Sequence, residues 1–147
     1  TLSENRHGLI VDVHTTQAAG TAAREAATVM LARRPAPRRP DCPITVGADR
    51  GYDVAEFIEA LQDMNMVPHV AAKTQGSAVP EAIKETEGYA VSLRRRKMIE
   101  EAFGWVKEIG TLGRVMLRRL DRIRGEVLLN FAAYNLVRLG NLLAPSR

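Results

Sequence analysis

Cysteine and long apolar runs are scarce in this 147-residue sequence. The single cysteine, Cys42, can neither close an intramolecular disulfide nor build a thiolate zinc site, which excludes a disulfide scaffold and a zinc finger. No uninterrupted run of about 18 apolar residues occurs, and this argues against a membrane span. The sequence starts at Thr1 and has no charged and then apolar leader, so we expect a piece of a longer polypeptide that works in the cytoplasm.

The composition is that of a folded domain. Hydrophobic residues make up 46% of the sequence and charged residues 26%, which argues against a wholly disordered chain. A length of 147 residues is about that of one ordinary domain.

Basic residues are concentrated in one segment. Residues 94–124 hold ten basic and four acidic side chains, a net charge of +6, whereas the whole chain carries +4. A basic block beside a nearly neutral body is typical of a protein that binds a polyanion. An Arg-rich helical surface exposed to solvent would have the same composition, so charge alone leaves both interpretations open.

The order of local signals predicts alternating strands and helices. Runs of β-branched residues predict strands, and apolar positions three and four residues apart predict amphipathic helices. Asp53 is expected to cap the second helix, and Pro35, Pro37 and Pro40 to stop the first. The order predicts an α/β fold with parallel pairing of the last strands. The expected strands are 9–13, 44–49 and 66–72, and the expected helices are 21–34, 53–64, 93–109 and 122–143.

Asp49 is the first candidate for chemistry. It ends a short predicted strand, which is where α/β folds place their ligands, and Gly47 and Gly51 keep the backbone around it open to close approach. Strands also often end on an aspartate that only caps a turn or a helix, so both interpretations stay open.

A helix over residues 94–107 carries the second candidate. Arg96, Glu100 and Lys107 are spaced so that they share one face of a continuous helix, beside an apolar face. A carboxylate in that position can bind a hard metal ion while the cations hold phosphates. The alternative is an ordinary ion pair between Arg96 and Glu100 on a solvated helix, worth about 0.3–0.5 kcal/mol. Glu101 is a further candidate ligand, although it faces another side of the helix.

Five stretches of this sequence resemble the C-terminal part of a bacterial insertion-sequence transposase of the Asp-Asp-Glu type. The most specific element is the family pattern of Tyr, two residues, Arg, three residues, Glu, six residues and Lys. Arg96, Glu100 and Lys107 satisfy its last three positions, whereas Leu93 stands where the family has Tyr, and Tyr89 lies nearby out of register. The matching stretches are residues 3–12, 47–53, 68–71, 94–107 and 130–138.

This resemblance implies a ribonuclease H-like α/β fold, in which a mixed sheet has flanking helices, as in retroviral integrases. It implies that Asp49 is the second catalytic aspartate and Glu100 the catalytic glutamate. Carboxylates of this kind bind two Mg²⁺ ions about 3.5–4 Å apart, and Mn²⁺ can replace them. Arg96 and Lys107 would contact transposon-end DNA. Further candidate DNA contacts are Arg94, Arg95, Lys97, Arg114, Arg118 and Arg119.

The first catalytic aspartate is missing from this pattern. In a ribonuclease H-like fold it lies on the first strand, and two more strands and a helix precede the strand of the second aspartate. Between Asp12 and Asp49 there is room for a helix but not for two further strands. Residues 5–13 therefore resemble the end of the second strand, a hairpin turn and the third strand. We expect the first aspartate upstream of Thr1, and no catalysis by this chain alone.

The sequence thus predicts a DNA transposase fragment. Residues 1–112 would form a partial catalytic domain, and residues 113–147 a basic segment and packing helix of the same domain. The whole enzyme would cleave transposon ends and join the 3′-hydroxyl to target DNA, as a homodimer or larger assembly associated with the bacterial nucleoid. Two alternatives remain: a ribonuclease H-like nuclease that cleaves without joining, and a non-catalytic DNA-binding remnant of a decayed transposase.

Overall fold

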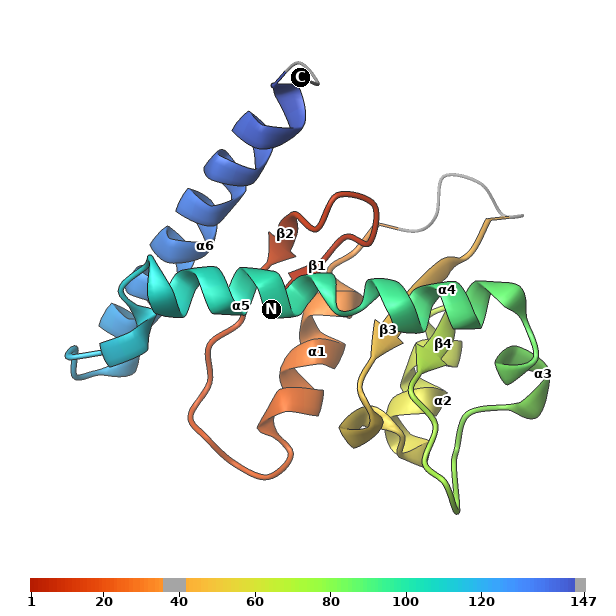
Figure 1. Cartoon of the computed structure of the whole chain (residues 1–147). Helices are drawn as coiled ribbons and strands as arrows, with labels where there is room; N and C mark the ends of the chain where they lie inside the picture. The colour runs from red at the N-terminus through yellow and green to blue at the C-terminus, as the bar shows by residue number, and fades with distance from the viewer. Residues whose placement is uncertain (36–41, 145–147) are drawn as a thin grey trace. The chain divides into compact units, whose positions relative to one another are not determined.

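The computed structural model describes residues 1–35 and 42–144, so Pro37 and Pro40 lie outside the described residues. The described elements are helices and short strands, with helices alone in the last part of the chain, which confirms the mixed α/β class (Figure 1). In the described ranges the strands pair into two two-stranded sheets, one antiparallel and one parallel. The chain divides into two compact units, residues 31–97 and residues 1–30 with 98–147.

The unit of residues 31–97 is built on the parallel pair of β3 and β4. The β-branched start of β3 suits a strand, and its register runs from Ile44 beside Met66 to Ala48 beside Val70. The helices α2, α3 and α4 pack against these strands. Parallel pairing of the last strands is therefore confirmed. The elements of this unit are β3 Ile44–Ala48, η1 Arg50–Tyr52, α2 Ala55–Asp63, β4 Met66–Val70, α3 Glu81–Lys84 and α4 Glu87–Arg95.

Helix α2 ends through a residue in the left-handed region. Its apolar stripe of Phe57, Ile58 and Leu61 is buried, as the spacing predicts. Asn65, at φ 55°, follows the C-cap residue Met64 and donates its amide hydrogen to Gln62 O at 2.8 Å. Asn adopts this conformation more readily than most residues and commonly ends helices there. The chain thus turns directly from α2 into β4.

The other unit begins with an antiparallel hairpin. β1 pairs with β2, and Glu4 caps the turn between them by accepting hydrogen bonds from the amides of Arg6, His7 and Leu9. The hairpin turn and the strand after it lie within residues 5–13 as predicted, whereas the strand before the turn, β1, ends earlier, at Ser3. The elements of this unit are β1 Leu2–Ser3, β2 Ile10–Asp12, most of α1 Ala22–Ala32, α5 Met98–Glu108, η2 Leu112–Arg114 and α6 Leu120–Leu143.

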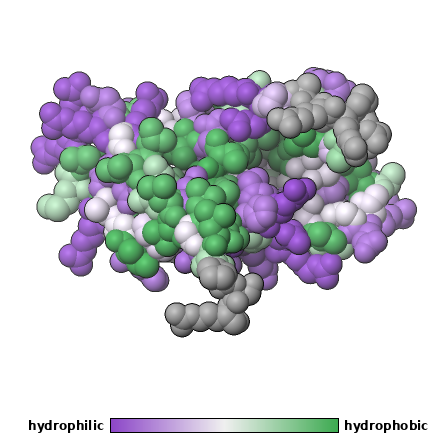
Figure 2. All heavy atoms as spheres, turned by 90° about the horizontal axis from the view of Figure 1, so that it is seen from above, coloured by the Kyte–Doolittle hydropathy of each residue, from purple (hydrophilic) through white to green (hydrophobic). Residues whose placement is uncertain are grey.

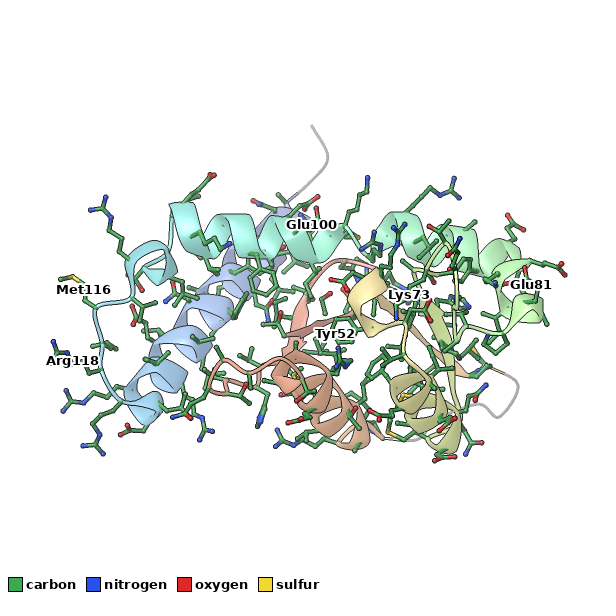
Figure 3. The ribbon with its side chains drawn as sticks, turned by 90° about the horizontal axis from the view of Figure 1, so that it is seen from below. Tyr52, Lys73, Glu81, Glu100, Met116 and Arg118 are labelled. Carbon is green, nitrogen blue, oxygen red and sulfur yellow. The ribbon has the colours of Figure 1, made fainter. Side chains whose placement is uncertain are left out.

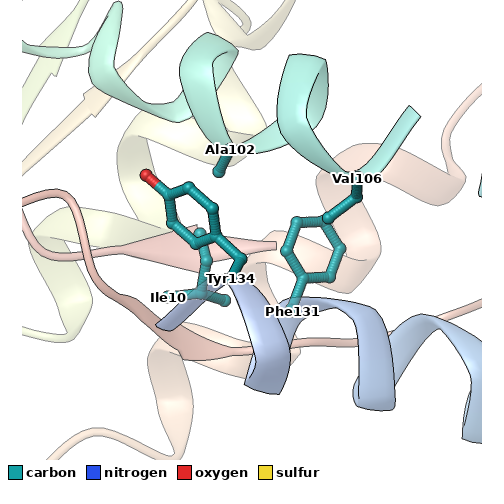
Figure 4. Close-up of a cluster of buried hydrophobic side chains, with 5 residues drawn as sticks. All are labelled: Ile10, Ala102, Val106, Phe131 and Tyr134. Carbon is teal, nitrogen blue, oxygen red and sulfur yellow. The ribbon is translucent and has the colours of Figure 1, made fainter. Parts of the chain in front are cut away.

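A small hydrophobic cluster joins α5, α6 and β2 (Figure 4). Ala102 and Val106 of α5 are 0% and 1% exposed and meet Phe131 and Tyr134 of α6 and Ile10 of β2. The packed side of α5 is thereby fixed, because Ala102 and Val106 are four residues apart on one face. Trp105 packs against the same cluster, and the acids and Lys107 of α5 are exposed.

Polar side chains of α6 fasten the hairpin to this cluster. The amide of Asn135 accepts from Ile10 N at 2.8 Å and donates to Ile10 O at 2.7 Å, so it pairs with the edge of β2 as a neighbouring strand would. Arg138 Nε donates to His7 O at 2.9 Å, and Arg138 NH1 lies 3.6 Å from Glu101 Oε2. The stretch 130–138, which carries part of the family resemblance, is therefore a structural face of this unit.

No helix in the described part of the chain is long and apolar enough to cross a membrane.

Candidate functional site

Asp49 directly follows β3, at the carboxyl end of the parallel pair. Its Oδ1 accepts a hydrogen bond from Gly51 N at 2.8 Å and so caps η1. A Cβ on Gly51 would lie 3.1 Å from that oxygen, so the glycine gives the carboxylate its room. The side chain is exposed, and Oδ2 has no hydrogen-bond partner among the described residues. Asp49 is thus a cap that keeps one oxygen available for a ligand.

Asp53 does not cap α2, so that prediction was wrong. Val54 occupies the N-cap position without a side-chain cap. The Asp53 carboxylate is 0% exposed and accepts hydrogen bonds from Lys73 N at 2.6 Å and Ala78 N at 2.8 Å. It therefore holds the loop after β4 against the start of α2. The backbone amides that it satisfies belong to residues 20 and 25 positions away in the sequence. A helix cap, in contrast, bonds to amides in the first turn of its own helix.

The environment of Asp53 lowers the pKa of its carboxyl group. Burial alone would raise this pKa, but hydrogen bonds from the Lys73 amide, the Ser77 side chain and the Ala78 amide, together with the Lys73 charge, outweigh it. The lowered pKa means that the folded protein favours the ionised form. The resulting stability is present above the ordinary aspartate pKa of about 3.9 and is lost as the pH falls through the lowered value.

Asp53→Asn is expected to lower the free energy of unfolding by about 1.5–3 kcal/mol at pH 7, because an amide cannot accept from both backbone N–H groups. Urea unfolding at pH 7 and pH 3 measures this, and the difference between variant and wild type should shrink at the lower pH. Asp63→Asn, at an exposed position on α2, is the control and should change stability by less than about 0.5 kcal/mol. Equal stability of Asp53→Asn and wild type at pH 7 would contradict the loop-holding role.

His69 on β4 is a packed residue. It is 5% exposed, and its Nδ1 lies 2.6 Å from Ser92 Oγ of α4. Burial lowers the pKa of the imidazole. Tyr89 meets the His69 ring edge-on, donates its hydroxyl hydrogen to Val70 O at 2.8 Å and accepts from Ala72 N at 3.1 Å. These contacts attach α4 to the carboxyl end of β4, next to the Asp49 edge of the sheet.

Glu100 and Glu101 both lie in the first turn of α5, where the helix dipole favours carboxylates. Glu101 is engaged by Arg138 across the contact with α6. Glu100 is exposed and has no hydrogen-bond or ion-pair partner among the described residues (Figure 3). Of the two acids, Glu100 is therefore the one whose oxygens are available.

Lys107 lies two helical turns after Glu100 and is also exposed. Seven residues of α-helix rise about 10.5 Å and bring the side chains back to the same face. This face is opposite Ala102 and Val106, which are buried. Figure 3 shows Glu100 on α5, among the side chains of this outward surface.

The predicted single helix over residues 93–109 is wrong. The chain forms α4 up to Arg95, a turn at Arg96 and Lys97, and α5 from Met98. Cations lie in the last turn of α4, where they stabilise the negative end of that helix dipole. Acids lie in the first turn of α5, where they stabilise the positive end of the next helix dipole. This charge pattern suits one helix that ends and another that begins. Arg96 is thus the C-cap of α4 and does not share a continuous helix with Glu100 and Lys107.

Most of the predicted DNA-contacting side chains are exposed. Arg96 is half-buried. Arg119 lies 3.3 Å from Asp121 at the start of α6. The exposed members of the set are Arg94, Arg95, Lys97, Lys107, Arg114, Arg118 and Arg119.

Residues 1–136 match the family described as Transposase DDE domain. The chain belongs to this family. Its members cleave and transfer DNA, so DNA is the substrate class of this transposase domain, and they typically work with divalent metal ions. No curated protein and no solved structure matches the chain significantly.

The structure distributes the predicted site residues of this transposase domain over two units. Glu100 and Lys107 share the outer face of α5 in one unit, and Asp49 and Arg96 belong to residues 31–97. Within residues 1–35 and 42–144, no group of three or more His, Cys, Asp or Glu side chains is placed to hold a metal ion. Joint binding of a metal by Asp49 and Glu100 therefore stays a prediction. Sequence reasoning missed the roles of Asp53, Asn135 and Arg138, since each acts on residues distant in the chain.

Proposed function

We propose that this chain is the C-terminal part of the catalytic domain of a bacterial insertion-sequence transposase with a ribonuclease H-like fold. The whole enzyme cleaves phosphodiester bonds at transposon ends and transfers the 3′-hydroxyl strand into target DNA. The observation that carries the proposal is Glu100, whose exposed carboxylate lacks a protein partner on the outer face of α5, while Arg138 engages the neighbouring Glu101.

Asp49 and Glu100 are the catalytic carboxylates of this proposal and its metal ligands. Both are exposed, and each has carboxylate oxygen that no described group occupies. Such hard oxygen donors fit Mg²⁺, and also Mn²⁺. Two bound ions would activate the attacking oxygen and stabilise the leaving oxygen of a phosphodiester. The protein supplies the fixed positions, at the end of β3 for Asp49 and in the first turn of α5 for Glu100.

The element order supports a first aspartate outside this chain. β1 and β2 form an antiparallel hairpin, the described residues between β2 and β3 contain only α1, and Asp49 follows β3. That order corresponds to the second strand, third strand, first helix and fourth strand of a ribonuclease H-like fold. Asp12 then lies on the third strand, where the mechanism has no carboxylate. Residues 1–112 form the partial catalytic domain, and 113–147 its basic segment and packing helix.

The basic residues position DNA in this proposal. Arg96 and Lys107 hold the transposon end, and the exposed arginines and lysine around them track the phosphate backbone. Contacts of this kind make binding strongly salt-dependent. The complex contains at least two copies of the transposase and acts on the bacterial nucleoid.

Nicking and strand transfer on transposon-end DNA with Mg²⁺ test this proposal. Residues 1–147 alone should bind DNA with an affinity that falls steeply with salt, and should not turn over. A protein that adds the upstream segment should cleave and join. Robust turnover by residues 1–147 that Asp49→Ala abolishes would refute the missing aspartate. Cleavage without joining would indicate a nuclease, and DNA binding without cleavage by the longer protein would indicate a non-catalytic remnant.

Gly104 provides a further test of the outer face of α5. It lies between Glu100 and Lys107, and a Cβ there would meet no atom within 4 Å. Gly104→Ala is therefore expected to raise the free energy of unfolding by about 0.5–1 kcal/mol. DNA affinity should nevertheless fall several-fold, because the methyl group would stand where the DNA backbone approaches. Urea unfolding and DNA titration measure the two effects, and a loss of stability would indicate a packing role instead.

A further inference from the structure

The loop of residues 115–119, between η2 and α6, exposes three apolar side chains in succession. Met116 is 90% exposed, more than any other large hydrophobic residue among the described residues, and Val115 and Leu117 are 42% and 40% exposed. Figure 3 shows Met116 and Arg118 on this loop, at one extremity of their unit. Figure 2 shows hydrophobic residues in contiguous patches on the face seen from above, with hydrophilic residues around them. Contiguous exposed apolar residues rimmed by polar ones are a feature of binding surfaces.

Hydrogen bonds and packing hold the base of this loop. Asn130 of α6 is buried, accepts from Thr111 N at 2.9 Å, and donates to Thr111 Oγ1 and Glu126 O, both at 2.9 Å. Leu112 packs against the cluster of α5 and α6. A Cβ at Gly113 would overlap the carbonyl oxygen of Lys107, so the chain runs in direct contact with the end of α5. The apolar tip is thus held out from a fixed base.

Arginines flank the apolar tip on both sides. Arg114 precedes it, and Arg118 and Arg119 follow it, and all three are exposed. Asp121 lies 3.3 Å from Arg119. A short apolar tip between cations fits a ligand with an apolar interior and anionic edges. Duplex DNA has this chemistry, since its stacked bases lie between two phosphate backbones.

We propose that Met116 is a wedge that inserts between adjacent base pairs of bound DNA, while Arg114, Arg118 and Arg119 hold the flanking phosphates. Apolar side chains such as methionine and leucine unstack base steps in this way and kink the duplex. The proposal rests on the proposed function only in taking DNA as the ligand. It adds a mode of DNA deformation and assigns it to a loop outside the catalytic residues.

Such a wedge needs a loop backbone that is already held in place. Unstacking one base step costs a few kcal/mol, so the backbone that carries the inserting side chain should not also lose much conformational freedom on binding. The contacts of Asn130, Leu112 and Gly113 fix the backbone before DNA arrives. Burying Met116 against bases also removes an apolar side chain from water, which offsets part of the unstacking cost.

Fluorescence of 2-aminopurine tests the wedge, because this base brightens when it loses its stacking neighbours. A series of mixed-sequence duplexes, each with 2-aminopurine at a different position, is titrated with residues 1–147. We expect saturable binding and a rise of at least about twofold at one or more positions. Met116→Ala should bind with nearly the same salt dependence but lose the rise, and Met116→Leu should keep it. Arg118→Ala should weaken binding to every duplex and lower the salt slope by about one.

Leu136→Ala is the matched control, since Leu136 of α6 is 72% exposed, and it should leave the fluorescence unchanged. Saturated DNA binding without any rise, or a rise that Met116→Ala retains, would overturn the wedge and leave the proposed function intact. No DNA binding at any salt would overturn both. Binding to vesicles of phosphatidylserine and phosphatidylcholine that depends on Met116, without DNA unstacking, would assign the loop to a membrane surface and overturn the wedge.

Discussion

Glu100→Gln is expected to remove DNA cleavage and strand transfer from a transposase that contains this chain, whereas Glu101→Gln should leave both nearly unchanged. The two acids are adjacent in the first turn of α5, so they share the same helix end, and both are exposed. They differ in what engages them, because Arg138 binds Glu101 while Glu100 has no partner in the described part of the chain.

The expected size of the loss follows from the charge that the carboxylate contributes. An amide at position 100 keeps the shape of the side chain but loses its negative charge, and a bound metal ion supplies several kcal/mol of transition-state stabilisation in such sites. A loss of about 4 kcal/mol corresponds to a rate about 1,000-fold lower. Asp49→Asn should cause a loss of similar size.

Single-turnover cleavage of transposon-end DNA with Mg²⁺ measures this prediction. Glu101→Gln loses an ion pair between partly exposed groups, which contributes at most about 1 kcal/mol to stability, so it controls for a general disturbance of α5. Retained cleavage by Glu100→Gln, or an equal loss in Glu101→Gln, would remove Glu100 from the catalytic set.

Phe131→Ala is expected to lower the free energy of unfolding by about 3–5 kcal/mol, as large-to-small changes of a buried aromatic residue do. Phe131 is 2% exposed and lies in the cluster that joins α5 and α6, with its ring edge-on to Phe103 at 5.6 Å between centroids. The cavity would face Ala102 and Val106, which fix the packed side of α5. The orientation of Glu100 therefore depends on this residue.

Urea unfolding measures the loss, with Leu129→Ala as the control on the same helix. Leu129 is 70% exposed, so its truncation should change stability by no more than about 0.5 kcal/mol. DNA cleavage by Phe131→Ala, measured well below its unfolding transition, should also fall. Equal stabilities of the two variants would contradict the packing of α6 against α5.

The sequence predicts the elements whose signals are local. The β-branched run at Ile44 gives β3, the apolar stripe of Phe57 and Leu61 gives α2, and the turn after Glu4 gives the hairpin. The same local signals place Asp49 at a strand end and Glu100 on a helix, as the structure has them. The spacing of apolar residues and the choice of turn residues determine these features, and both are read from a short segment of the sequence.

Other features depend on partners far away in the chain. The break at Arg96 interrupts a stretch whose apolar spacing continues, so periodicity does not reveal it. Asp53 stands where a helix cap is expected, yet its hydrogen bonds go to backbone amides of a later loop. Asn135 pairs with Ile10 across 125 residues. Hydrogen bonds of this kind leave no periodic signal in the sequence.

We propose that Asp49 and Glu100 bind the same divalent ions. Mn²⁺ titration of residues 1–147, followed by electron paramagnetic resonance, tests it with Asp49→Asn, Glu100→Gln and the double variant. Two ligands of one site are strongly coupled, so each single change should weaken binding at least about tenfold, and the double variant should be little weaker than either. Additive effects of the two changes, or affinities equal to that of the unchanged chain, would contradict the shared site.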